Sequence, residues 1–296
     1  MARRFPRRYL VGYLFLLPFA VHFSAFVLFP FLSSVYLTFT NWNLLTMTKD
    51  FVGLSNYAGI FTDEIFYKAV ANTMTYVVFD SAGVVVFGLL MGAALNARIK
   101  GIGIFRTAFY IPVVVDWVIV STVWMFIFDP AFGLANYGLS MLGMPKQMFL
   151  QSPAQALPII IVSSIWKGVG YYAVFYLAAL QDVPEALIEA ARMDGASSAT
   201  CFWHITLPQI APVSVFIIIM AVIGALKGFD QFYLMTAGGP ARATATIMFY
   251  FYEVAFGFMQ MGRGATIAVI FTAIVLVTVL IQRTLLNRMA GASGVN

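Results

Sequence analysis

Five charged side chains interrupt apolar stretches long enough to span a membrane, and these are the residues best placed to do chemistry. They are Asp80, Asp116, Lys167, Lys227 and Asp230. A charge at membrane depth is costly, so it usually faces a partner, the protein interior or an aqueous pathway. We expect Asp116 and Lys167 at comparable depth, where they could pair between helices. Lys227 and Asp230, three residues apart, could pair on one helix. Structural ion pairing and a pathway role both stay open.

Aromatic side chains accompany these charges on the same predicted helices. A mixture of aromatic faces and polar groups is typical of a cavity for a small molecule. Packing is the competing explanation for any single ring, because aromatic residues make up 16% of the chain. The aromatic candidates are Trp166, Tyr171, Tyr172, Phe229 and Tyr233. The predicted pathway residues are Asp116, Lys167, Tyr171, Lys227, Asp230 and Tyr233.

Residues 182–208 are predicted to form a helix-turn-helix. They include a polar island, residues 189–208, that lies between two apolar runs. Asp182 is the expected cap of the first helix, with Glu185 three residues later in a capping-box arrangement. Gly195 is expected to end that helix with a positive φ angle. Ser197 or Ser198 can then cap a second helix. An ordinary interfacial hairpin is the alternative on composition alone.

The composition identifies an integral membrane protein. Hydrophobic residues make up 61% of the chain, charged residues 10%, and the mean hydropathy is +0.90, whereas soluble proteins carry about 25% charged residues. The net charge is +5, but the basic residues flank apolar runs and have no motif for nucleic acid, so no nucleic-acid partner is expected. A single cysteine, Cys201, excludes an internal disulfide, and with two histidines no metal site is expected.

Six candidate membrane spans must position these residues, since a spanning helix needs about 20 apolar residues. The first follows a basic start that resembles a signal peptide, but its apolar run continues without a clear cleavage site, so an uncleaved span is expected. Residues 237–261 are predicted to form an interfacial helix on the outer face, with a seventh span as the alternative. The six spans are Tyr9–Phe31, Val70–Leu95, Thr107–Phe128, Ala156–Leu180, Val213–Met235 and Ala265–Leu285.

The distribution of Lys and Arg predicts the orientation of these spans. Basic residues gather in the N-terminal tail, in the loop after the second span and at the C-terminal end, which favours the cytoplasm for both termini and for residues 181–212. Cys201 would then be cytoplasmic. The basic residues concerned are Arg3, Arg4, Arg7, Arg8, Arg98, Lys100, Arg106, Arg283 and Arg288.

The polar island also resembles a known motif, the EAA loop of permease subunits in ABC importers. The matching pattern begins with Glu189, Ala190 and Ala191, continues with Gly195 and ends with Ile205, Leu207 and Pro208. The resemblance implies that this cytoplasmic loop contacts the ATPase. The coupling residues that it implies are Glu185, Glu189, Ala190, Ala191, Asp194, Gly195, Leu207 and Pro208.

Further segments resemble carbohydrate-uptake permeases of the maltose type. These segments are 53–57 (Gly-Leu-Ser-Asn-Tyr), 105–107 (Phe-Arg-Thr) and 236–240 (Thr-Ala-Gly-Gly-Pro). The resemblance implies an all-α type I importer permease with six transmembrane helices in the cytoplasmic (inner) membrane. Residues 1–296 would form a single transmembrane domain, with 182–208 as its coupling loop.

The same resemblance implies partners and leaves alternatives. The expected partners are a second permease subunit, two ATPase subunits, an extracytoplasmic solute-binding protein and membrane lipid. The chain lacks a Gly-x-x-x-x-Gly-Lys-Ser/Thr phosphate loop, so we expect no enzyme activity and no cofactor in it, with ATP and Mg²⁺ on the partner ATPase. The alternatives are an ion-coupled secondary transporter, a membrane scaffold for an ATPase, and a glycerol-phosphate rather than sugar cargo.

Overall fold

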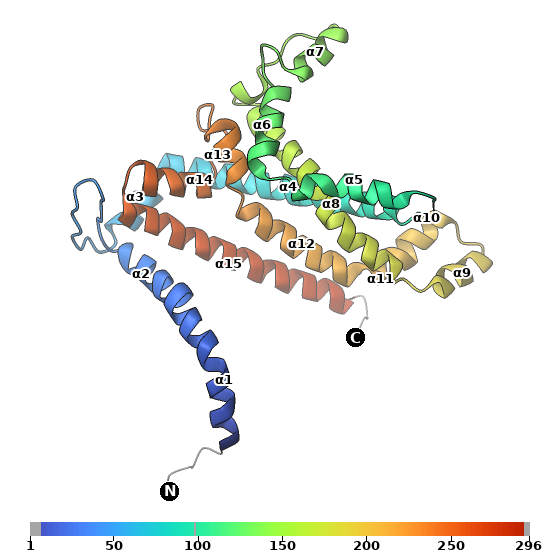
Figure 1. The fold of residues 1–296 in the computed structure, drawn as a ribbon, viewed down its shortest axis with the longest axis horizontal. Helices are drawn as coiled ribbons and strands as arrows, with labels where there is room; N and C mark the ends of the chain where they lie inside the picture. The colour runs from blue at the N-terminus through green and yellow to red at the C-terminus, as the bar shows by residue number, and fades with distance from the viewer. Residues whose placement is uncertain (1–6, 98, 293–296) are drawn as a thin grey trace. The chain divides into compact units, whose positions relative to one another are not determined.

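The structure, a computed structural model, describes residues 7–97 and 99–292 (Figure 1). In these ranges the regular elements are helices, and the β-type pairing recorded consists of isolated bridges. The expected all-α class is therefore confirmed. Arg3, Arg4 and Arg98, which contributed to the predicted orientation, lie outside the described residues.

The chain divides into two compact units, which we describe separately. The first comprises residues 1–63 and 251–272, and the second comprises residues 64–250 and 273–296. The last helix, α15 (Met261–Ala292), contributes residues 261–272 to the first unit and the residues from 273 onward to the second.

The first unit begins with one long apolar helix. α1 (Arg7–Phe23), a π-helical turn (Ser24–Leu28) and α2 (Phe29–Leu37) follow one another directly. From Gly12 to Leu37 the helix has the length and hydropathy of a membrane span. Most of its side chains are exposed, and none from Gly12 to Leu37 is buried; that of Phe15, for example, is 81% exposed. An apolar surface of this kind is stable in lipid or against another protein.

Side-chain hydrogen bonds organise the rest of the first unit. α3 (Ser55–Phe61) carries Asn56, whose amide nitrogen donates to the carbonyl oxygens of Thr38 and Thr40, both at 2.8 Å. Asp63 forms an ion pair with Arg263 near the start of α15. The segment 53–57, singled out for its resemblance, thus helps fix the turn after the first span.

The second unit is centred on three packed helices, α4 (Glu64–Leu95), α8 (Ala156–Gln181) and α12 (Ala211–Leu226). α4 and α8 pack closely because α4 presents small residues. A Cβ atom added to Gly92 would lie 2.8 Å from Cβ of Tyr176 and 3.0 Å from the carbonyl oxygen of Ala173. Only glycine allows this approach without a shift of one helix.

One of the predicted spans is bent, and a second bend precedes another. The third, expected as one helix, is divided into α5 (Ile102–Val114) and α6 (Trp117–Ile127), which meet at 97°. The helical segment Ser198–Gln209 meets α12 at 68°. The predicted span Thr107–Phe128 is thus present as a bent pair and not as one continuous helix, because Pro112 and Asp116 favour a helix end and a helix start.

The fifth predicted span is also shorter than expected. α12 ends at Leu226, and the separate helix α13 (Asp230–Thr236) follows after a short break. The first, second, fourth and sixth spans are found as long helices. The third corresponds to the bent pair α5–α6, and the fifth corresponds to α12 with α13. A helix is present within 237–261 as α14 (Ile247–Tyr252) and a π-helical turn (Glu253–Gly257).

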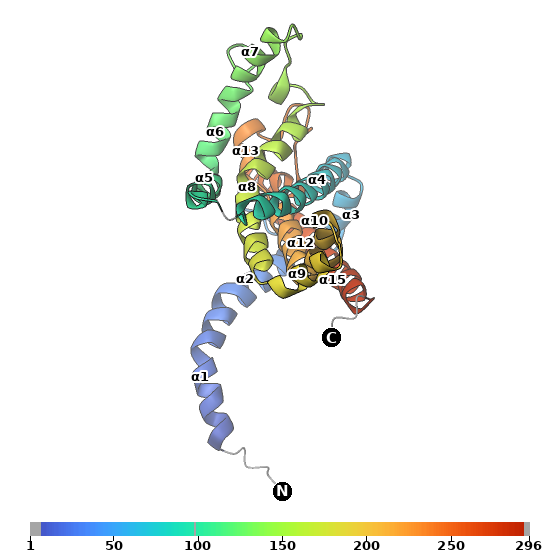
Figure 2. The same ribbon diagram turned by 90° about the vertical axis from the view of Figure 1, so that its right-hand side faces the viewer.

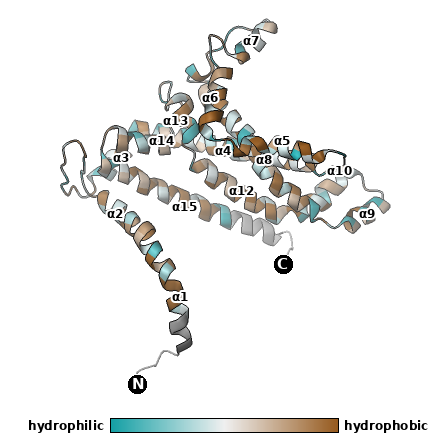
Figure 3. Ribbon diagram, in the orientation of Figure 1, coloured by the Kyte–Doolittle hydropathy of each residue, from teal (hydrophilic) through white to brown (hydrophobic). Residues whose placement is uncertain are grey.

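Short helices lie at two opposite ends of the second unit. α7 (Leu134–Met141) lies beyond α6, and α9 (Glu185–Met193) lies beyond the far end of α8 (Figures 1 and 2). α12 is largely hydrophobic along its length, whereas α9 carries hydrophilic residues (Figure 3). This is the distribution expected when the helices between these ends cross a membrane.

Candidate functional site

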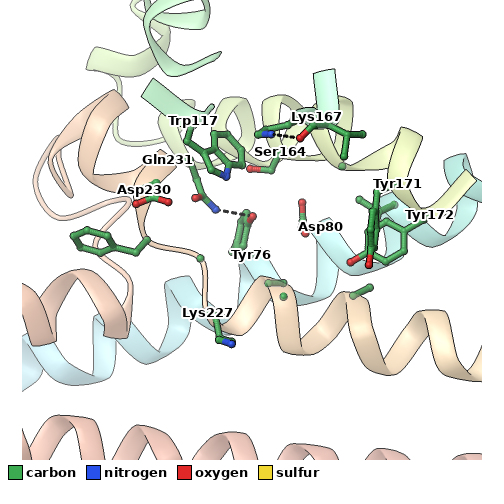
Figure 4. A pocket seen from close by; sticks show the side chains of 18 residues that line it. Tyr76, Asp80, Trp117, Ser164, Lys167, Tyr171, Tyr172, Lys227, Asp230 and Gln231 are labelled. Carbon is green, nitrogen blue, oxygen red and sulfur yellow. Dashed lines mark hydrogen bonds between the residues drawn. The ribbon is translucent and has the colours of Figure 1, made fainter. Parts of the chain in front are cut away.

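A polar cavity of about 310 Å³ lies inside the apolar bundle of the second unit (Figure 4). Each helix contributes one face at helical spacing, because residues three or four positions apart lie on the same side. α4 contributes Tyr76, Asp80 and Val84; α8 contributes Ser164, Lys167, Gly168, Tyr171 and Tyr172; α12 contributes Ala221, Gly224 and Ala225. The wall is completed by Val113 and Trp117, on either side of the break between α5 and α6, and by residues 227–231, from the break after α12 and the start of α13.

The interior of the cavity carries hydrogen-bonding groups. Gln231 is 3% exposed and donates from Nε2 to the Tyr76 hydroxyl at 2.8 Å. Asp80 is 8% exposed, and its Oδ1 atom has no hydrogen-bond partner among the described residues. The hydroxyl of Ser164 is also buried without a partner there. Buried polar groups are nearly always hydrogen-bonded, so these two mark positions where a bound molecule can form bonds.

Lys167 and Asp116 stabilise the break between α5 and α6. The Lys167 ammonium donates to the carbonyl oxygens of Pro112 at 3.2 Å and Val113 at 3.1 Å. Asp116 caps α6 and accepts a hydrogen bond from the amide of Val118 at 2.8 Å. A break in a spanning helix frees backbone groups that hydrocarbon cannot satisfy, and these side chains satisfy several of them.

The direct ion pair expected between Asp116 and Lys167 is not formed in the described chain. Instead, each side chain forms hydrogen bonds with backbone groups at the break. Lys167 also lies over the ring of Trp117, 5.3 Å from its centroid. Both residues contact the break between α5 and α6, which the sequence analysis did not predict.

The local pair expected between Lys227 and Asp230 is not formed in the described chain either. Lys227 is the C-cap of α12, whereas Asp230 is the first residue of α13, so the two are not on one helix. Both side chains are exposed and line the cavity at the break. The spacing of three residues predicts a contact only when the helix is continuous.

The other predicted pathway residues are divided between the cavity and its surroundings. Lys167, Tyr171, Lys227 and Asp230 line the cavity, whereas Asp116 and Tyr233 do not. Tyr171 packs edge-on against Tyr172, with 5.2 Å between ring centroids. Among the remaining aromatic candidates, Phe229 lines the cavity and stacks on Tyr233, while Trp166 lies outside it against Trp124.

Several cavity residues were not predicted as a site. Asp80 was recognised as a charge at membrane depth but was not grouped with the pathway residues, and Tyr76, Ser164 and Gln231 were missed. The spacing of Tyr76 and Asp80, four apart, and of Ser164 and Lys167, three apart, could have placed each pair on one helix face. Gln231 had no such signal, because it follows the unpredicted break.

The helix-turn-helix of residues 182–208 has the predicted form with one correction. Asp182 follows α8 as its C-cap, and the N-cap of α9 is Pro184, which forms no side-chain cap hydrogen bond. Gly195 has φ +86°, as predicted. Ser197 caps the second helix and accepts a hydrogen bond from the amide of Thr200 at 3.1 Å.

α9 presents different residues to the bundle and to solvent. Ile188 packs against the buried cluster that includes Val183 and Ile210. Glu185, Glu189 and Arg192 line a groove of about 800 Å³ that also includes Arg106 from α5. Among the other predicted coupling residues, Ala190, Asp194, Gly195 and Pro208 are exposed, whereas Ala191 and Leu207 are half-buried.

Large apolar side chains are also exposed along this helix-turn-helix. Met193 is 88% exposed and Trp203 is 63% exposed. Exposed apolar groups next to charged ones are typical of surfaces that bind another protein. Cys201, in contrast, is 4% exposed, so its thiol is buried beneath this surface.

Bent apolar helices around a polar cavity, with a polar helix-turn-helix at one end, define a membrane permease subunit. Residues 84–291 match the model of the family described as binding-protein-dependent transport system inner membrane component. The chain belongs to this family.

The chain is similar along most of its length to several known permeases. It is 34% identical to the multiple sugar-binding transport system permease protein MsmF of Streptococcus mutans, over 92% of this chain and 93% of that protein. It is 30% identical to the sn-glycerol-3-phosphate transport system permease protein UgpA of Yersinia pestis, over 93% of this chain and 94% of that protein.

A solved structure shares the fold. A chain in the crystal structure of a bacterial alginate ABC transporter, in complex with an alginate pentasaccharide-bound periplasmic protein, superposes with a TM-score of 0.84. The two chains are 25% identical, and the match covers 96% of each. The type I importer permease fold expected from the sequence is thereby confirmed.

Proposed function

We propose that this permease moves a sugar or a related small polyhydroxyl solute inward across the cytoplasmic membrane. The observation that carries the proposal is the polar cavity among α4, α8 and α12, because hydrogen-bonding groups inside an apolar bundle mark a solute pathway. Tyr76, Tyr171 and Tyr172 provide ring faces, and Asp80, Ser164 and Gln231 provide polar atoms. The similarity to a permease named for multiple sugars supports the same cargo class.

The helix-turn-helix of residues 182–208 is the proposed contact with an ATPase. Its charged residues Glu185, Glu189 and Arg192 and its exposed Met193 and Trp203 suit a protein partner. ATP and Mg²⁺ would be held by two such ATPase subunits. A second permease subunit and an extracytoplasmic solute-binding protein would complete the transporter. Both termini and the helix-turn-helix would then lie in the cytoplasm.

One other cargo has specific support, because the similarity to UgpA favours a glycerol phosphate. The ion-coupled secondary transporter that the sequence left open would use the charged residues Asp80, Lys167 and Asp230 as ion sites, but the family match argues against it.

Transport in proteoliposomes distinguishes these functions. The complex purified with its partners is reconstituted, and uptake of labelled neutral sugars and of glycerol phosphate is measured with its solute-binding protein outside and ATP inside. The proposal predicts uptake that requires ATP and the binding protein. Uptake driven by a proton or sodium gradient without ATP would select the secondary transporter, and uptake of glycerol phosphate alone would select the other cargo.

A further inference from the structure

The cavity holds a buried acid that the described residues leave without a partner. Asp80, on α4, is 8% exposed, and its Oδ1 atom accepts no hydrogen bond in the described chain. A buried carboxylate is normally paired with a cation or held by several donors, because burying an unpaired charge is costly. Figure 4 shows Asp80 between the pair Tyr76–Gln231 and the two rings of Tyr171 and Tyr172.

The lysines that line the cavity are directed elsewhere. Lys167 donates to the carbonyl oxygens of Pro112 and Val113, which occupy two of its three donor positions. The Lys227 side chain points away from Asp80 in Figure 4, and it is exposed. Neither lysine forms an ion pair with Asp80 in the described chain. The other acid of the lining, Asp230, adds a second negative charge at the break.

Neighbouring polar groups do not supply the missing donor. The Gln231 amide nitrogen donates to the Tyr76 hydroxyl at 2.8 Å. The Ser164 hydroxyl is buried without a hydrogen-bond partner among the described residues, so it can donate or accept. The cavity therefore offers an acceptor at Asp80 beside a hydroxyl at Ser164, and it has room for a small polyhydroxyl molecule.

We propose that Asp80 is a specificity-determining residue that makes the cavity select uncharged or cationic cargo bearing hydroxyl or amine donors, and reject anionic cargo. A phosphate or carboxylate brings acceptors and a negative charge, which the Asp80 carboxylate repels, whereas a hydroxyl or an ammonium group donates to it. This inference rests on the proposed role of the cavity as the solute pathway. Under this proposal, glycerol phosphate and acidic polysaccharides are not cargo of this permease.

Charge-selective labelling inside the cavity tests the proposal. Cys201→Ser removes the native thiol, and Ser164→Cys places a new thiol beside Asp80 with little change in volume. The assembled complex, in membranes, is treated with methanethiosulfonate reagents that carry either a trimethylammonium or a sulfonate group. The measured quantity is the ratio of the two reaction rates, so the ionisation of the thiol cancels.

The reference ratio comes from Met144→Cys, an exposed position in the loop after α7. We expect the ratio at Ser164→Cys to favour the cation by about tenfold over that reference, because a negative charge in the same partly hydrated cavity has an effect of this order. Asp80→Asn, added to the same background, is expected to return the ratio to the reference. Gly224→Cys provides a second thiol position, since an added Cβ there meets only the Tyr172 hydroxyl at 3.7 Å.

Each outcome decides a different point. A cation preference that Asp80→Asn removes supports the proposal. Equal rates at both thiol positions, or a preference that survives Asp80→Asn, would overturn the role of Asp80 while leaving the cavity as an aqueous pathway. Absence of reaction with both reagents at both positions, with and without ATP, would overturn the pathway itself and therefore the proposed function.

Discussion

The ammonium nitrogen of Lys167 lies 3.1 Å from the carbonyl oxygen of Val113, so α8 holds the end of α5 at the point where the third span breaks. A second bond to Pro112 at 3.2 Å and the cap from Asp116 to the amide of Val118 complete the arrangement. At this bend of 97°, side chains therefore bind two carbonyl oxygens and one amide that the helix break leaves free. We infer that this break is a fixed part of the fold and that it shapes one wall of the cavity.

Replacement of Lys167 by methionine is expected to destabilise the complex and to lower uptake. Hydrogen bonds to charged groups contribute about 1.5–3 kcal/mol each, so the loss of two is a large effect. Lys227→Met is the matched control, because Lys227 is exposed and forms no hydrogen bond to the break between α5 and α6 among the described residues. We expect Lys227→Met to assemble normally and to impair uptake only. Thermal unfolding of the purified complex measures the difference, and equal midpoints for the two variants would contradict it.

Asp116 allows a test of the cap on α6. Asp116→Ala removes the acceptor for the Val118 amide and should cost about 0.5–2 kcal/mol, whereas Asp116→Asn keeps an acceptor and should cost little. The relevant quantity is again the midpoint of thermal unfolding, followed by uptake. If alanine and asparagine had the same effect, the negative charge rather than the cap would be the property that matters.

The turn at Gly195 needs glycine for its positive φ angle and not because a larger side chain would collide with neighbouring atoms. Its φ is +86°, and an added Cβ would meet nothing within 4 Å. Gly195→Val should therefore disturb the turn and displace the second helix, at about 1–2 kcal/mol for the unfavourable angle. Gly195→Asn should retain most activity, because asparagine tolerates a positive φ. ATP hydrolysis stimulated by cargo is the readout, and full stimulation with valine would exclude a coupling role for this turn.

Sidedness is testable with a thiol placed at the surface. Cys201 is 4% exposed and should react slowly with reagent from either side. In a Cys201→Ser background, Ile99→Cys, in the exposed loop after α4, should react with an impermeant reagent only in permeabilised cells or inside-out vesicles. Met144→Cys should react from outside intact cells. Modification of Ile99→Cys from outside intact cells would reverse the proposed orientation.

The sequence predicted those parts of the fold that depend on local pattern. Apolar runs gave the six spans, and the positive φ at Gly195 and the cap at Ser197 followed from residue type. The breaks at residues 115–116 and 227–229 were missed, because tertiary contacts such as that of Lys167 with Val113 stabilise an end that hydropathy does not reveal. Because these breaks were missed, ion pairs were predicted for Asp116 and Lys227 that are not formed in the described chain. Gln231, which follows the second break, was overlooked for the same reason.

The measurement that tests the central claim most directly is ATP hydrolysis by the reconstituted complex carrying Glu189→Lys. Glu189 lies on the exposed face of α9 beside the groove that includes Arg106 and Arg192. Reversal of its charge should weaken a contact with the ATPase by repulsion, with a smaller effect if solvent screens the pair. Glu64→Lys, an equal reversal at the exposed start of α4, is the control.

With assembly verified separately, we predict that Glu189→Lys lowers both cargo-stimulated hydrolysis and uptake by about tenfold if the contact is desolvated, while Glu64→Lys leaves both near the unmodified level. Undiminished stimulation and uptake in Glu189→Lys, together with the same result in Gly195→Val, would show that the helix-turn-helix of residues 182–208 does not couple this permease to ATP hydrolysis.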